Sequence, residues 1–160
     1  MGILASDLRI NVIQPVLKSI GLYSLAAENL LLGTAVQESL CGKHLVQVQG
    51  PALGIYQIEP DTHDDAWQNY LNFRHELAGK VRGFASSDFD QSSENRHQEL
   101  VLNLGYATAI ARIVYYRKPE ALPDDPNDIE ALARYWKKHY NTPLGKGTTE
   151  EFVRNYKDFV

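Results

Sequence analysis

Apolar residues recur at helical spacing along most of the chain. In the segment from residue 6 to residue 20 they fall on one helical face, and Pro15 predicts a kink or a break within it. The next segment, residues 25–39, follows Ser24, which is a favourable N-cap residue. This second segment is apolar on nearly all sides, so we expect it to form a buried, central helix.

The spacing of apolar residues changes between residues 42 and 60. Apolar and polar residues alternate over residues 45–49, the pair Gly50-Pro51 interrupts the run, and a second short run covers residues 54–58. Alternation with a period of two, flanked by glycine and proline, is typical of paired strands. We therefore expect a small β hairpin in this part of the chain.

Helical patterns return after Pro60, which opens one helix. A longer helical pattern covers about residues 94–117, and Thr148 with Glu151 forms a capping box for the final helix. Strands and helices do not alternate, which argues against a doubly wound sheet. The predicted fold class is mainly α, more exactly α+β, with a helical bundle around the buried second helix and a small β hairpin. The length of 160 residues fits one domain covering the whole chain.

The composition argues against several classes of function. The net charge is -4 and no basic stripe is visible, as a nucleic-acid-binding protein would have. No stretch approaches the roughly 18 apolar residues of a membrane span. The single cysteine cannot form an internal disulfide, and the five histidines show no metal-binding spacing. We accordingly expect no nucleic-acid partner, no membrane span, no metal site and no cofactor.

Glu38 is the residue that points most directly to a chemical role. It lies in the last turn of the apolar second helix, where the helix dipole disfavours a negative charge. An apolar environment also disfavours the charged form and raises the pKa of a carboxyl group. A carboxylic acid that keeps its proton near neutral pH is what the cleavage of a glycosidic bond requires. We therefore take Glu38 as the candidate catalytic acid; alternatively, its side chain points into solvent.

Three short motifs occur in a fixed order along the chain. They are Glu38-Ser39, the run of residues 54–58 (Gly-Ile-Tyr-Gln-Ile) followed by Pro60 and Thr62, and Tyr140-Asn141 followed by Gly145 and Gly147. In their order and spacing the motifs resemble those of the soluble lytic transglycosylases, which belong to the lysozyme-like superfamily. The resemblance covers about residues 16–145.

The resemblance implies a lysozyme-like fold with an active-site cleft beside the hairpin. It also implies cleavage of the β-1,4 bond between N-acetylmuramic acid and N-acetylglucosamine in peptidoglycan, with glycan strands as the binding partner. Glu38 would be the catalytic residue, and Tyr140 would approach and orient it. The implied substrate-binding residues are Ser39, Tyr56, Gln57, Thr62, Tyr140 and Asn141.

The sequence departs from this pattern at three places. Tyr56 stands where transglycosylases usually have methionine. The family pattern ends in Tyr-Asn-x-Gly, whereas here Thr142-Pro143 follows Tyr140-Asn141 and the glycine comes later. The run of residues 54–58 also resembles a strand of the animal-type lysozymes, but Ala52 occupies the position of their second carboxylate. Without that carboxylate, the sugar's own 6-hydroxyl would attack and give a 1,6-anhydro product, as in the transglycosylases.

The sequence is also compatible with other functions. Glu59, Asp61 or Asp64 would position a water molecule if the enzyme were an inverting muramidase, and a chitinase-like hydrolase is a further alternative. A protein that keeps the scaffold without turnover would serve as a binding or structural component of a virion or a secretion apparatus.

The N-terminal segment bears on where such a protein would act. It has no basic region ahead of its apolar residues, and Asp7 and Arg9 interrupt the apolar run, so we expect no secretory signal peptide. A wall-cleaving protein of this kind would be made in the cytoplasm. It would reach the wall after release, or as a component of a bacteriophage or its virion.

Overall fold

The computed structural model describes residues 2–142 and 144–160, and the regular elements in these ranges are all helical. In chain order they are α1 (Ala5–Leu8), the π-helical turn η1 (Arg9–Ile13), α2 (Gln14–Ser19), α3 (Leu25–Ser39), α4 (Pro60–Gln68), the 3-10 turn η2 (Leu71–Phe73), α5 (His75–Arg82), the 3-10 turn η3 (Phe89–Gln91), α6 (Ser93–Leu102), α7 (Leu104–Tyr116), α8 (Ile129–Trp136), the π-helical turn η4 (Lys137–Asn141) and α9 (Thr149–Phe159).

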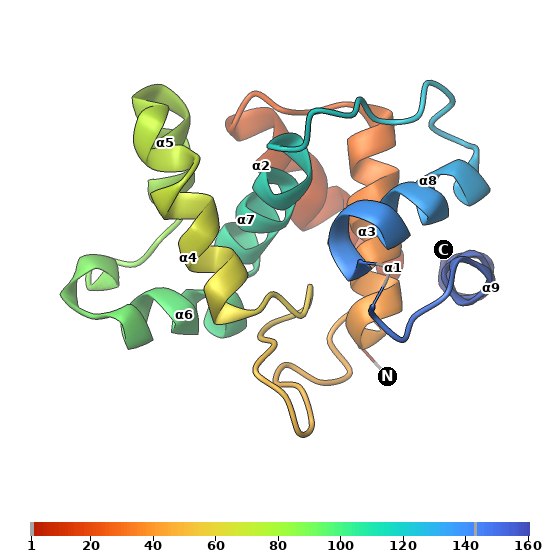
Figure 1. Cartoon of the computed structure of the whole chain (residues 1–160), viewed down its shortest axis with the longest axis horizontal. Coiled ribbons are helices and arrows are strands. Elements are labelled where there is room, and N and C mark those ends of the chain that lie inside the picture. The colour runs from red at the N-terminus through yellow and green to blue at the C-terminus, as the bar shows by residue number, and fades with distance from the viewer. Residues whose placement is uncertain (1, 143) are drawn as a thin grey trace.

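The second helix of the sequence pattern is α3, and it has the predicted bounds. The Ser24 hydroxyl accepts a hydrogen bond from the Ala27 amide at 3.1 Å, which satisfies one of the free N–H groups at the start of the helix. Nearly every side chain of α3 is buried, including the polar Thr34, whose hydroxyl lies 2.7 Å from that of Tyr115 on α7. Because α3 contacts α7, α8 and α9, it forms the centre of the fold (Figure 1).

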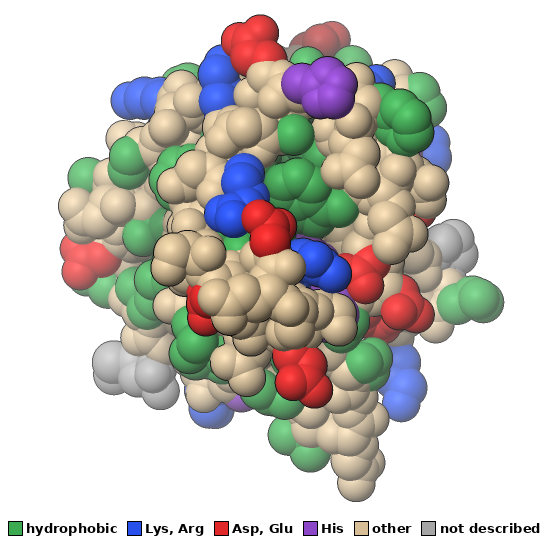
Figure 2. All heavy atoms as spheres, turned by 90° about the vertical axis from the view of Figure 1, so that its left-hand side faces the viewer, with side chains coloured by type: hydrophobic (Ala, Val, Ile, Leu, Met, Phe, Trp, Pro, Cys, Tyr) green, Lys and Arg blue, Asp and Glu red, His purple; other side chains and the backbone are tan. Residues whose placement is uncertain are grey.

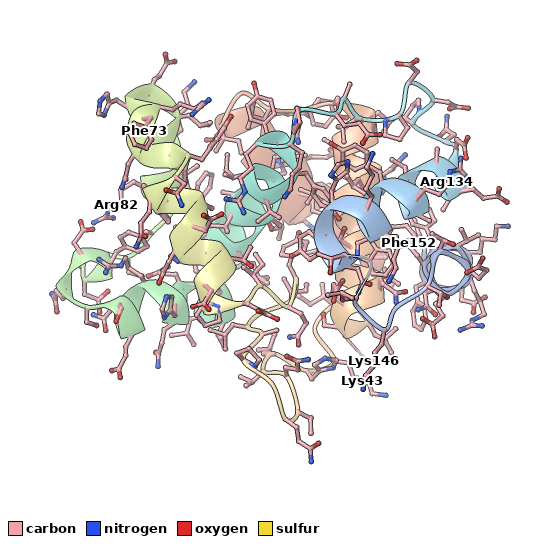
Figure 3. All side chains as sticks on the ribbon, viewed as in Figure 1. Lys43, Phe73, Arg82, Arg134, Lys146 and Phe152 are labelled. Atoms are coloured by element: carbon pink, nitrogen blue, oxygen red, sulfur yellow. The ribbon has the colours of Figure 1, made fainter. Side chains whose placement is uncertain are left out.

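A glycine allows α9 to approach α3 closely. A Cβ atom at Gly33 would lie 2.3 Å from the ring of Phe152, which is fully buried and points from α9 toward α3 (Figure 3). The capping box predicted for this last helix is present, since Thr148 and Glu151 each accept a hydrogen bond from the other's backbone amide. The contact between α3 and α9 therefore depends on a small residue in one helix and a ring in the other.

Two interruptions divide the longer helical patterns. The π-helical turn η1 precedes Pro15, which stands at the start of α2, so the irregularity predicted there is present as a change of helix type. The helix predicted over about residues 94–117 is two helices, α6 and α7. Asn103 has extended backbone angles between them, and its side chain accepts a hydrogen bond from the Tyr106 amide at 3.0 Å.

The predicted β hairpin is wrong, and with it the α+β assignment. The described residues contain no strand, and residues 42–59 form a loop whose pairing is limited to the isolated bridges Val46–Leu53 and Leu53–Ile58. Left-handed backbone angles at Gly42, Gln49, Gly54 and Gln57 turn the chain every few residues, so no extended segment is long enough to pair. The alternation over residues 45–49 does not correspond to a buried face, since Leu45, Val46 and Val48 are exposed, whereas Ile55, Tyr56 and Ile58 of the second run are buried.

The helices from α4 onward form two groups around α3 and α7. Helices α4, α5 and α6 all contact α7, whereas α8 and α9 contact each other and α3 (Figure 1). The loop of residues 42–59 connects the C-terminal end of α3 to the N-terminal end of α4, at one edge of the molecule (Figure 1). None of the helices in the described ranges combines the length and apolar character that a membrane span requires.

Candidate active site

An open cleft of about 670 Å³ lies at the end of α3. Its walls come from α3, the loop of residues 42–59, the first turn of α4, α7, η4 and the loop that precedes α9. The lining residues are Glu38, His44, Gln47, Ala52, Gln57, Ile58, Glu59, Thr62, Val114, Tyr140, Asn141, Thr142, Leu144, Gly145, Lys146 and Gly147. Five of the seven residues that the sequence motifs indicated, namely Glu38, Gln57, Thr62, Tyr140 and Asn141, therefore meet in one cavity.

Glu38 is a partly buried residue whose side chain lines this cleft. Helix α3 ends just after it, where Leu40 adopts left-handed angles and its amide donates to the Val36 carbonyl. Burial raises the pKa of Glu38 from 4.5 to about 7, against the opposing effect of one hydrogen bond from Trp136. At neutral pH a substantial fraction of Glu38 therefore carries a proton, as a general acid requires.

Trp136 holds the Glu38 side chain in place. Its indole N–H donates to Glu38 Oε1 at 2.9 Å, and the indole is fully buried at the end of α8. Its ring packs against that of Phe152, with centroids 5.3 Å apart, and a Cβ atom at Gly147 would lie 2.7 Å from it. A tryptophan fixed on these sides orients the carboxyl group. Sequence reasoning missed Trp136, because an aromatic residue on an amphipathic helix is usually a core residue.

The orienting role expected for Tyr140 is not present in this structure. The Tyr140 hydroxyl donates to the Tyr56 carbonyl oxygen at 2.7 Å, and its ring stacks on that of Tyr115 at 5.1 Å. Its hydroxyl is therefore committed to the loop of residues 42–59, although its side chain still lines the cleft. The hydrogen bond to Glu38 comes from Trp136, which lies one helical turn before Tyr140 in the sequence.

Asn141 lines the cleft from η4. Its side-chain oxygen accepts a hydrogen bond from the Lys137 ammonium group at 2.6 Å, and the same ammonium group donates to the Gly145 carbonyl at 2.8 Å. These bonds tie η4 to the loop that follows it. Lys146, on that loop, lines the cleft and lies near the same edge of the molecule as the exposed Lys43 (Figure 3).

Gln57 and Thr62 supply polar groups to the cleft from neighbouring parts of the chain. Gln57 has a left-handed φ of 47°, and its side-chain amide donates to the Gly54 carbonyl at 2.8 Å. A residue other than glycine in this conformation is uncommon and is often found at functional sites. Thr62 lies in the first turn of α4, where it lines the same cavity.

The buried side chains of Ser39 and Tyr56 do not line the cleft, so the structure does not bring them together with the other predicted sugar-binding residues. The Ser39 hydroxyl is buried, donates to the Ile55 carbonyl at 2.7 Å and accepts from the Gly42 amide at 2.8 Å. The Tyr56 side chain is also buried, and its hydroxyl lies 3.0 Å from that of Thr108. Both side chains fix the loop that carries Gln57, because each is already hydrogen-bonded within the fold.

The three acidic residues considered as partners of Glu38 lie in different surroundings. Glu59 is exposed and lines the cleft, whereas Asp61 is exposed outside its lining. Asp64 lies 2.9 Å from a ring nitrogen of His63 and 2.9 Å from one of His97, away from the cleft. Of these three, Glu59 is the carboxylate placed to face a substrate together with Glu38.

Comparisons of the chain with models of protein families, with curated proteins and with solved structures gave no match. A function for the cleft therefore has to be argued from its geometry and from the motifs that the sequence carries.

Proposed function

We propose that this protein cleaves the β-1,4 bond between N-acetylmuramic acid and N-acetylglucosamine in peptidoglycan, with Glu38 as its acid and base. The observation that carries the proposal is the partly buried Glu38 carboxyl, whose pKa is raised to about 7, at the wall of an open cleft. A cleft open on one side suits a polymer better than a closed pocket would. The motifs shared with the soluble lytic transglycosylases support the same substrate class.

The reaction would proceed in two proton transfers through Glu38. Protonated Glu38 first donates its proton to the glycosidic oxygen, the bond from that oxygen to C1 of the muramic acid breaks, and positive charge develops on the sugar ring. The Glu38 carboxylate then accepts the proton of the 6-hydroxyl of the same sugar while that oxygen bonds to C1. The products are a 1,6-anhydro sugar and a free 4-hydroxyl group.

The surroundings of Glu38 suit both steps. Burial favours the protonated form that starts the reaction, and the N–H of Trp136, 2.9 Å from Oε1, stabilises the carboxylate that forms in between. Because Trp136 occupies Oε1, Oε2 is the oxygen that would exchange its proton with the substrate. Gln57, Thr62 and Asn141 offer amide and hydroxyl groups on the cleft walls for the sugars.

A second candidate function is supported by Glu59. This exposed carboxylate lines the same cleft, and in an inverting muramidase it would activate a water molecule on the other face of the sugar. Ala52 lines the cleft where animal-type lysozymes carry their second carboxylate, so a retaining mechanism of that kind lacks its nucleophile. The proposed site of action is the bacterial cell wall, reached after release from the cell or as part of a virion.

The experiment is digestion of purified peptidoglycan by the wild-type protein, Glu38→Gln and Glu59→Gln, with the soluble products identified by mass spectrometry. Anhydromuropeptides from the wild type and Glu59→Gln, but not from Glu38→Gln, are the expected result. Reducing-end muropeptides that both variants fail to release would identify an inverting hydrolase instead. Equal products from the wild type and Glu38→Gln would refute the role of Glu38.

Two further outcomes separate the remaining alternatives. Digestion of chitin but not of peptidoglycan would indicate a chitinase-like enzyme. Sedimentation of the protein with peptidoglycan, without products from any of the three proteins, would indicate a binding or structural component.

A further inference from the structure

A second group of reactive side chains lies outside the cleft, between α4 and α6. His63 and Asp64 are consecutive residues of α4, and His97 belongs to α6. One nitrogen of each imidazole and one oxygen of the carboxylate all lie within 4.8 Å of one another. None of these three residues lines the cleft of Glu38, so the proton transfers proposed above do not involve them.

The spacing of these atoms is close to that of a metal-ligand set. Asp64 Oδ1 lies 2.9 Å from His63 Nδ1 and 2.9 Å from His97 Nε2. Zinc bonds of about 2.0–2.1 Å in tetrahedral geometry place neighbouring ligand atoms about 3.4 Å apart. The two imidazole nitrogens lie within 4.8 Å of each other, so side-chain movements of the order of an ångström would allow all three ligand atoms to reach one ion.

The cluster combines a fixed, buried ligand with ligands that solvent can reach. The His63 side chain is fully buried, whereas those of Asp64 and His97 are 34% and 21% exposed. His63 and Asp64 also line a hollow of about 300 Å³, which leaves room for water in further coordination positions. Two imidazoles and one carboxylate with an open side is a donor set that suits divalent first-row transition metals.

The hydrogen bond between His63 and Tyr106 would orient the imidazole of His63 as a ligand. Its other ring nitrogen, Nε2, lies 2.7 Å from the Tyr106 hydroxyl, and this hydroxyl accepts a hydrogen bond from the Trp67 indole at 2.8 Å. The imidazole rings of His63 and His97 meet edge to face, with centroids 5.4 Å apart. Metal-binding histidines almost always have such a partner at the nitrogen that faces away from the metal, because it fixes the ring.

The charges around the hollow are partly balanced. Arg82 and Arg96 line it, but Arg82 is paired with Asp90 at 2.7 Å and lies over the ring of Phe89. The side of the molecule that carries α5 and α6 faces the viewer in Figure 2, where basic and acidic side chains lie next to one another. Asp64 is the carboxylate that lies within hydrogen-bond distance of both imidazoles.

We propose that His63, Asp64 and His97 bind one divalent transition-metal ion of the zinc type, which joins α4 to α6. The expectation of no metal site was based on the short-range spacing of histidines in the sequence. Such spacing cannot reveal this site, because 33 residues separate Asp64 from His97. The proposed role is structural and separate from peptidoglycan cleavage, because His63, Asp64 and His97 do not line the cleft.

The test uses the full chain, stripped of metal with a chelator and then titrated with Zn²⁺ in a calorimeter. We expect one Zn²⁺ per chain, with affinity at least tenfold weaker in His97→Gln and in Asp64→Asn. His75→Gln is the matched control, because His75 is an exposed histidine at the start of α5 and should bind as the wild type does.

Thermal unfolding gives a second measurement on the same proteins. Zn²⁺ at about a hundredfold excess over its Kd should raise the Tm of the wild type by about 5–10 °C, and that of His97→Gln much less. Absence of Zn²⁺ binding by the wild type would mean a hydrogen-bonded cluster only, and would overturn the proposal. Equal Zn²⁺ binding by wild type and both ligand variants would overturn it as well. Neither result depends on whether the protein cleaves peptidoglycan.

Discussion

Replacing Glu38 by glutamine should stabilise the folded protein at alkaline pH and leave its stability at acidic pH almost unchanged. The reason is that the fold holds this carboxyl where its charged form is disfavoured, with a pKa of about 7 in place of 4.5. Glutamine has nearly the same shape, carries no charge at any pH, and offers an oxygen to the Trp136 N–H. The variant therefore removes the ionisation and keeps the packing and the hydrogen bond.

The size and sign of the effect follow from the two pKa values. Below pH 4.5 the carboxyl is protonated in the folded and unfolded chain, so its ionisation has no effect on stability. Between pH 4.5 and about 7 the unfolded chain releases this proton while the folded chain keeps it, so the wild type loses stability as the pH rises. Because one pKa unit is worth about 1.4 kcal/mol, the loss is about 3 kcal/mol in total.

The assay is urea unfolding of the wild type and Glu38→Gln at a series of pH values from 4 to 8.5, read by circular dichroism. The difference in unfolding free energy should grow in favour of the variant up to about pH 7 and then level off. Glu59→Gln is the control, because it removes an exposed carboxylate from the same cleft and measures the general effect of one lost charge. A difference that stays constant across this range, or that grows in favour of the wild type, would refute the reasoning.

Three further substitutions test individual hydrogen bonds of the site. Trp136→Phe removes the hydrogen-bond donor to Glu38, which should raise the pKa of Glu38 further. The alkaline limb of the pH–rate profile should then move to higher pH, and a limb that does not move would contradict this. Ser39→Ala should lower the unfolding free energy by about 1–3 kcal/mol and leave the identity of the glycan products unchanged, whereas a sugar-binding serine would chiefly affect turnover. Tyr140→Phe leaves the Tyr56 carbonyl without its donor and should cost about 1–3 kcal/mol in urea unfolding; a loss of activity at full stability would restore a direct catalytic role.

The sequence determined those parts of the fold that depend on short-range pattern. The central helix α3 begins and ends where apolar continuity and the Ser24 cap predict, and the capping box of α9 is present. The interruption before Pro15 was also predictable, since proline cannot donate a backbone hydrogen bond inside a helix. In each case the deciding interaction joins residues within a few positions of one another.

The hairpin prediction was wrong because a short alternation of apolar and polar residues does not by itself give two extended segments that can pair, and the apolar residues of this run, Leu45, Val46 and Val48, are exposed. Residues 42–59 instead form a loop with left-handed turns, whose shape depends on hydrogen bonds from Ser39 and Tyr140 in other elements. The break between α6 and α7 was also missed. Asn103 caps the start of α7, and the helical spacing of apolar residues does not reveal such a cap.

The sequence alone pointed to Glu38, because a carboxyl at the end of an apolar helix is unusual. Only the tertiary structure placed Trp136 against it, since 98 residues separate the two side chains that share this hydrogen bond. The same is true of His97, which the packing of α6 brings to His63 and Asp64 on α4. Residue type and local period identify a group with unusual chemistry, whereas its partners are set by long-range packing, which no local pattern encodes.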